Sequence, residues 1–155
     1  MTQYRRTELG DFNSVVCFKA VITGVEDTLG PDGAAVVFTR AGKVRGHNLV
    51  KELGLAGSKL PVEELAGVLD QAVGKDGTAL CGVKRSYREG ENIVVEVVDT
   101  VCAAGEEMGG DRLATFTLGA IWGAVEGIMG ETYLGEHTES MLKGAPVEKF
   151  VFSPF

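Results

Sequence analysis

The sequence predicts an α+β fold in which N-terminal helices pack on a small antiparallel sheet. Apolar residues recur at helical spacing as far as about Val73, whereas segments rich in Val and Ile follow in the second half of the chain. A glycine-rich central helix is expected between two β-hairpins. Helices that precede strands in this order are typical of an α+β domain with an antiparallel sheet.

The first helix is expected to begin at Asp11 or Asn13, since either side chain can cap a helix N-terminus. It is expected to end near Leu29. The next residues, Gly30-Pro31-Asp32-Gly33, form a strong turn sequence that stops a helix.

Further helical segments are predicted before the strands begin. Residues 34–38 form an apolar run that fits either a strand or a helix, and residues 42–53 have the spacing of an amphipathic helix. Pro61 favours the first turn of another helix. Acidic residues at 63 and 64 suit its N-terminus, and the glycines at 74–77 end it.

Each hairpin is predicted by two β-prone segments around a turn. The first joins 78–88 to 93–101, and the second joins 132–142 to 147–155. Residues 103–111, after the first hairpin, contain three glycines. They are expected to form a flexible loop, with the alternative that this loop acts as a lid.

The glycine-rich helix lies between Leu113 and Gly130, in the sequence LATFTLGAIWGAVEGIMG. Its glycines Gly119, Gly123 and Gly127 recur every four residues and therefore form a flat groove on one face. Each of them costs about 1 kcal/mol of helix stability relative to alanine. We therefore expect another backbone or a flat ligand to pack directly on this groove.

The composition argues against several classes of protein. Lys and Arg number 15 and Asp and Glu 22, so the net charge of −7 argues against nucleic acid as a partner. The apolar run 114–129 is shorter than the roughly 20 residues that cross a bilayer, so no membrane span is expected. No apolar signal core opens the chain, and three distant cysteines fit reduced thiols, as in a cytoplasmic protein. Residues 1–10 are predicted to form a polar arm, and 11–155 a single domain.

No residue pattern predicts catalysis, a metal or a cofactor. His47 and His137 have no close partner at metal-ligand spacing, and each is expected to be a surface or structural residue. No spacing pairs a nucleophile with a base. Glu126 is expected at the solvated edge of the glycine-rich helix, with a buried, paired carboxylate as the alternative.

The C-terminal part of the chain carries a resemblance to a known family. Residues 116–152, FTLGAIWGAVEGIMGETYLGEHTESMLKGAPVEKFVF, resemble the last block of the vinyl reductase (4-vinyl reductase) domain family, which includes hydrocarbon-binding proteins. The same block is similar to that of the small subunits of the transport protein particle (TRAPP), a vesicle-tethering complex. Upstream, residues 41–49 resemble the glycine-spaced helix of this family.

The resemblance implies a TRAPP-like fold, a homodimer formed through the N-terminal helices, and a non-enzymatic cytosolic protein that binds a small apolar molecule. A lipid tail or an aromatic hydrocarbon fits that description. The alternatives are a scaffold subunit of an assembly and an accessory factor in tetrapyrrole vinyl reduction. The candidate pocket residues are apolar side chains of the predicted helices and the loop between them: Leu49, Leu53, Leu60, Leu65, Phe116, Leu118, Ile121, Trp122 and Val125.

Two departures from the family limit what the resemblance implies. Many vinyl reductase domains have two cysteines on the last hairpin, where this chain has Ser140 and Glu148. A serine is a poor metal ligand, so no metal is expected. Residues 57–60 contain no cysteine, so the covalent acylation of some TRAPP subunits is not expected either, although a non-covalent apolar ligand is.

Overall fold

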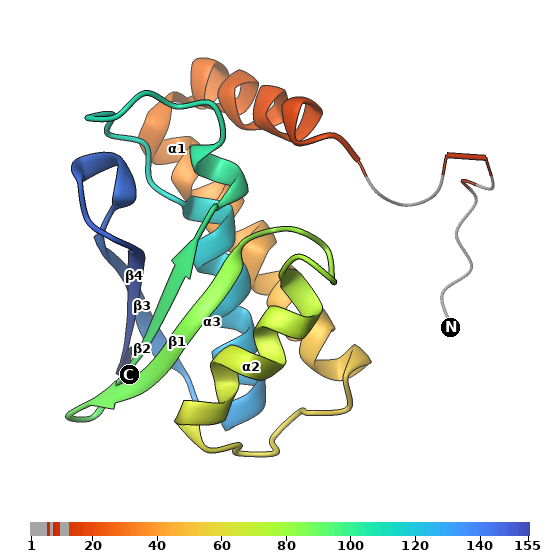
Figure 1. Ribbon diagram of the computed structural model, residues 1–155, viewed down its shortest axis with the longest axis vertical. Helices are drawn as coiled ribbons and strands as arrows, with labels where there is room; N and C mark the ends of the chain where they lie inside the picture. Colours follow the sequence, from red (N-terminus) through yellow and green to blue (C-terminus); the bar gives the residue numbers. More distant parts are fainter. Residues whose placement is uncertain (1–5, 7, 10–12) are drawn as a thin grey trace.

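The computed structural model describes Arg6, Glu8, Leu9 and residues 13–155, and it has the α+β architecture predicted from the sequence (Figure 1). Its helices are α1 (Val15–Glu52), α2 (Val62–Val73) and α3 (Thr115–Met129), with two short 3-10 helices, η1 (Val101–Ala103) and η2 (Met141–Lys143). Its strands are β1 (Gly82–Glu89), β2 (Asn92–Val98), β3 (Tyr133–Glu139) and β4 (Glu148–Pro154). Most of the predicted polar arm, 1–10, and the predicted cap Asp11 lie outside the described residues.

The four strands form one antiparallel sheet in the order β1-β2-β4-β3. Two hairpins, β1–β2 and β3–β4, flank α3 in the sequence, as predicted, and their inner strands pair with each other. The two inner strands supply fully buried side chains to the core: Ile93, Val95, Val97, Phe150 and Phe152. Helices α2 and α3 lie against the sheet, and the second half of α1 runs along α3 (Figure 1).

Helix α1 differs from the prediction at both ends of its first half. Ser14, not Asn13, caps it, because the Ser14 hydroxyl accepts a hydrogen bond from the Val16 amide at 3.1 Å. The predicted turn at 30–33 is only a break at Gly30, whose φ of 77° lies in the left-handed region that glycine tolerates. Pro31 then restarts the helix, since a first-turn residue needs no amide hydrogen. The segments 34–38 and 42–53 therefore belong to one helix.

Helices α1 and α3 touch through their backbones. A β-carbon on Gly119 or Gly123 would overlap the carbonyl oxygen of Thr39 or Lys43 in α1. The contact is mutual, because two α1 glycines approach α3 in the same way. A β-carbon on Gly42 would overlap the Phe116 carbonyl oxygen, and one on Gly46 that of Ala120. Backbone from α1 thus lies on the groove of α3.

Helix α2 is fixed to the edge strand β1 by one buried and one partly buried side chain. The Ser86 hydroxyl accepts a hydrogen bond from the Ala66 amide at 2.9 Å and donates one to the Val62 carbonyl at 2.6 Å. Asp70 Oδ1 accepts a hydrogen bond from the Val83 amide at 2.8 Å. No helix in the described part of the chain is long and apolar enough to span a membrane.

Candidate functional site

The residues predicted to line an apolar pocket lie in or against the core. Leu49, Leu65, Ile121 and Val125 are buried, whereas Leu53 is 43% exposed at the end of α1. Four others are partly buried and pack against the core cluster: Leu60, Phe116, Leu118 and Trp122. Of the groove glycines, Gly119 and Gly123 face α1 backbone, and Gly127 faces the Val50 side chain. The ligand-lining role of these residues stays a prediction.

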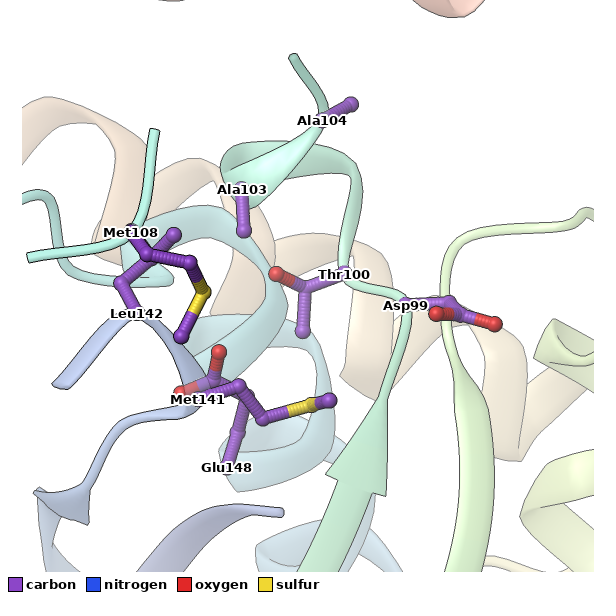
Figure 2. Close-up of a pocket in the computed structure, with 8 residues that line it drawn as sticks. All are labelled: Asp99, Thr100, Ala103, Ala104, Met108, Met141, Leu142 and Glu148. Atoms are coloured by element: carbon purple, nitrogen blue, oxygen red, sulfur yellow. The ribbon is translucent and has the colours of Figure 1, made fainter. Parts of the chain in front are cut away.

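A pocket lies elsewhere, at the end of the sheet where β2 leads into η1 and η2 leads into β4 (Figure 2). Its volume is about 340 Å³. It is lined by Asp99, Thr100, Ala103, Ala104, Met108, Met141, Leu142 and Glu148. None of the nine predicted lining residues is among them. Its volume is within the range of about 300–1,000 Å³ that is usual for small-molecule sites.

The pocket wall contains a buried acid paired with a histidine. Glu148 Oε2 lies 2.6 Å from His137 Nε2, and each of the two side chains is only 3% exposed. The amide of Ala114, at the start of α3, donates a hydrogen bond to His137 Nδ1 at 3.4 Å. A neutral imidazole that accepts at Nδ1 has its proton on Nε2, so His137 donates to Glu148. Among the described residues, no hydrogen bond reaches the other carboxyl oxygen, Glu148 Oε1.

Two buried hydroxyl groups nearby have no hydrogen-bond partner in the part of the chain described. They belong to Thr100, which lines the pocket, and to Ser140, which lies just before η2. Figure 2 shows the Thr100 hydroxyl and the Glu148 carboxyl group turned toward the space that Met108 and Met141 border. Buried polar groups are nearly always hydrogen-bonded, so an unpartnered one at a pocket marks a place where a ligand or water can bind.

Sequence reasoning identified some of these residues without connecting them. Ser140 and Glu148 were singled out only as positions that lack the family's cysteines, and His137 only as a surface or structural residue. The register pairs His137 with Phe150, so Glu148 lies diagonally opposite His137, beyond an irregularity between His137 and Glu139. The predicted hairpin did not specify that register, so it did not predict the contact. Thr100, Met108 and Met141 belong to irregular segments and carry no such signal. No group of three or more potential metal ligands occurs among the described residues.

Glu126 is not at a solvated edge, as the sequence suggested, but in a buried hydrogen-bonded cluster. Its Oε1 accepts hydrogen bonds from Lys43 Nζ at 3.1 Å, Trp122 Nε1 at 2.9 Å and the Tyr133 amide at 3.1 Å. Its Oε2 lies 3.2 Å from His47 Nε2. The alternative of a buried, paired carboxylate therefore holds. It was not the favoured interpretation because the partners, Lys43 and His47, lie about 80 residues away in sequence, on α1.

The pKa of Glu126 reflects two opposing effects. Burial favours the neutral acid, but the hydrogen bonds from Tyr133, Lys43 and Trp122, together with the Lys43 charge, outweigh it and hold the pKa below its usual value. Both carboxylate oxygens have partners, so this cluster connects α1, α3 and β3 and offers no free group to a ligand.

Cys81 is not an activated thiol. All three cysteines are free, with Cys17 exposed and Cys81 and Cys102 buried. Burial first, and then the negative charge of Asp70, raise the pKa of Cys81 to about 12. Its thiol is therefore protonated at neutral pH, and a protonated thiol is a poor nucleophile.

Solved structures of other proteins share the fold of this chain, whereas comparisons of sequence found no match. No family model and no curated protein sequence matches the chain. Among solved structures, it is similar to the phenol-responsive sensory domain of the transcription activator PoxR with phenol, with a TM-score of 0.68 and 18% identity over 94% of this chain and 76% of that one. It is also similar to a trafficking protein particle complex subunit 3 from Naegleria fowleri covalently bound to palmitic acid. There the TM-score is 0.61 and the identity 12%, over 91% of this chain and 95% of that one.

The chain thus has the TRAPP-like α+β fold that these two structures share. At identities of 18% and 12%, the likeness concerns the fold and not the ligand. Membership of the vinyl reductase family stays a prediction from the sequence.

Proposed function

We propose that the protein is a non-enzymatic, cytoplasmic binding protein for a small molecule with an apolar body. The observation that carries this proposal is the pocket at the end of the sheet, which combines apolar walls from Met108, Met141 and Leu142 with the buried polar groups of Thr100 and Glu148. Small-molecule sites typically have this composition, a mostly apolar lining with a few polar groups that orient the ligand.

The two similar structures support a binding role. One was solved with phenol and the other with covalently bound palmitic acid, so this fold accommodates small apolar molecules in both. Residues 57–60 here hold no cysteine, so we propose non-covalent binding.

Isothermal titration calorimetry can test the binding role with a panel of small aromatic and aliphatic compounds that includes 2-phenylethanol. We expect saturable binding to the wild type and none to Ala103→Phe, because the added ring fills the pocket from its wall. Ala56→Phe, on an exposed loop, is the matched control and should bind as the wild type does. Absence of binding across the panel, or equal binding by Ala103→Phe, would overturn the proposal.

We also propose that the protein is a homodimer formed through α1. This helix exposes seven large apolar side chains: Val15, Val16, Val21, Leu29, Val36, Val37 and Val44. Exposed apolar side chains on one element favour a protein interaction there. Light scattering should then give about twice the chain mass of 16.4 kDa. Val37→Glu with Val44→Glu, seven residues apart on one helix face, should give a monomer, and Leu134→Glu on β3 should not.

The same exposed face supports a second candidate, a scaffold subunit of a larger assembly. A monomeric mass in light scattering, combined with a stoichiometric partner that the Val37→Glu/Val44→Glu variant fails to retain, would favour that function over a homodimer.

A further inference from the structure

The pocket contains a buried carboxyl group with one oxygen that no described residue hydrogen-bonds. Glu148 is 2% exposed, and its only hydrogen bond among the described residues comes from His137. The other ring nitrogen of His137, Nδ1, accepts a hydrogen bond from the Ala114 amide at 3.4 Å. A buried carboxylate normally requires a cation or several donors to offset its lost hydration.

The cationic side chains around the pocket are paired with other acids. Lys19 lies 2.5 Å from Glu106, Lys143 pairs with Asp111, and Lys149 lies 3.7 Å from Glu139. The lining contains no Lys, Arg or His, and Asp99 adds a second carboxyl group. The lining therefore offers a carboxylate ligand no cationic side chain and offers an ammonium group two carboxyl groups, which disfavours the first and favours the second.

An independent observation concerns Thr100. Its residue is 3% exposed, its hydroxyl has no hydrogen-bond partner among the described residues, and it lines the pocket. The hydroxyl and the free Glu148 Oε1 are both acceptors. A ligand group with several N–H donors can therefore bond to both at once.

The remaining walls specify the rest of the ligand. Ala103, Met108, Met141 and Leu142 are apolar, and methionine side chains adapt to irregular shapes and contact aromatic rings favourably. A volume of 340 Å³ holds about ten heavy atoms if each takes roughly the 30 Å³ of a liquid water molecule. That size corresponds to one aromatic ring with a short side chain.

We propose that this pocket binds a small primary amine in its ammonium form, with an apolar body about the size of an aromatic ring and a short chain. The ammonium group donates to Glu148 Oε1 and Thr100 Oγ1, while Met108, Met141 and Leu142 contact the body. This inference rests on the proposed binding function and adds the chemical class of the ligand.

Calorimetry with three compounds that share one body and differ in head group tests the inference. They are 2-phenylethylamine, 2-phenylethanol and phenylacetate, all titrated into the wild-type protein at neutral pH. We expect the amine to bind roughly tenfold or more tightly than the alcohol, as for a hydrogen bond to a charged group. The carboxylate should bind most weakly. Because this comparison uses the wild type alone, it does not depend on the folding of any variant.

The Glu148→Gln variant tests whether Glu148 causes the preference for the amine. It keeps an acceptor for His137 but turns a neutral amide toward the pocket, so amine affinity should fall by roughly tenfold or more and alcohol affinity should change little. Glu91→Gln, in the exposed β1–β2 turn, removes the same charge far from the pocket and should leave both affinities unchanged. Thermal unfolding of each variant checks that it folds.

The outcomes separate the two proposals. If the alcohol binds and Ala103→Phe blocks it, but the amine is not preferred, the binding function stands and the amine inference is overturned. Preference for the carboxylate overturns the inference as well. If none of the three compounds binds, the inference fails, and the wider panel decides whether the binding function fails with it.

Discussion

The contact between α1 and α3 and the pocket at the end of the sheet are opposite kinds of structure. At the helix contact, Gly42 and Gly46 face α3 while Gly119 and Gly123 face α1, and no room remains for a methyl group. At the pocket, a volume of about 340 Å³ stays open, and Thr100 and Glu148 have hydrogen-bonding capacity that the described residues do not use.

The difference separates residues that determine the fold from residues that are available for binding. Close packing gains dispersion energy and tolerates few substitutions. An unpartnered buried polar group lowers stability, and structures retain such groups mainly at sites with another role. Substitutions in the two regions should therefore change stability in opposite directions.

The largest effect is expected at the helix contact. Alanine normally stabilises a helix relative to glycine, yet Gly123→Ala should lower the free energy of unfolding by about 3 kcal/mol, because its methyl group overlaps Lys43 backbone. The matched control is Gly67→Ala on α2, where no atom lies within 4 Å and a gain of about 0.5–1 kcal/mol is expected. Urea unfolding measures both. A neutral Gly123→Ala would show that the helices do not touch as described.

A smaller effect is expected at the polar cluster that joins the same helices. Glu126→Gln should cost about 2 kcal/mol at neutral pH, since the amide lacks the charge that Lys43 pairs with and its oxygen can replace only one of the two acceptors. Ser140→Ala, which removes a hydroxyl without a described partner, should cost much less.

The difference in stability between the wild type and Glu126→Gln should depend on pH, because the pKa of Glu126 is lowered in the folded protein. Because the folded carboxyl group binds its proton less readily than the unfolded one, its stabilisation is present above the unfolded value of about 4.3 and is lost as the pH falls through the folded value. Chemical unfolding at a series of pH values should show wild type and Glu126→Gln converging at acid pH. A gap that widens on acidification would contradict the sign of the shift.

A change of the opposite sign is expected at the pocket. Thr100→Val keeps the side-chain shape and removes the unpartnered hydroxyl, so the free protein should become more stable by up to about 1 kcal/mol. Thermal unfolding without ligand measures this change in stability. Calorimetry with 2-phenylethylamine should show weaker binding by the same variant. A destabilised Thr100→Val protein would mean that the hydroxyl has a structural role.

The smallest effect is expected at the start of α1. Ser14→Ala removes the side chain that accepts from the Val16 amide, at a cost of about 0.5 kcal/mol, the low end for a cap at an exposed helix end. Circular dichroism during thermal unfolding is sufficient to measure it. Asn13→Ala should have less effect, because Ser14 is the capping residue.

Much of the fold could be predicted because it depends on local patterns. The two hairpins and the helix between them follow from alternation, turn residues and a recurring glycine spacing, all within short windows of sequence. The break at Gly30 was harder to predict. Glycine and proline signal a turn in sequence, but whether a helix resumes at Pro31 is decided by contacts of the second half of α1 with α3.

The candidate site could be predicted only in part, because it is formed by residues far apart in the chain. Glu126 was placed at a solvated edge since periodicity carries no information about Lys43 on another helix. The pocket joins η1, η2 and the loop that contains Met108, and irregular segments have no period that places them side by side. The four-residue spacing of the α1 glycines, 42 and 46, matches that of the glycines in α3 and was a long-range signal that the sequence did contain.

The two halves of α1, on either side of the break at Gly30, should respond differently to ionic strength. Its first half makes two ion pairs with the segment before α3, Lys19 with Glu106 and Arg112 with Glu26. Its second half has the ion pair of Lys43 with Glu126, but close backbone contact with α3 at Gly42 and Gly46 holds it as well. Salt screens partly exposed charges over about 8 Å at physiological concentration and leaves close packing unaffected. Rising salt should therefore speed amide hydrogen exchange in 15–29 before 38–50. Because Lys19 also donates to the carbonyl of Ala104 in the pocket wall, a change in ionic strength should affect the pocket through the same segment.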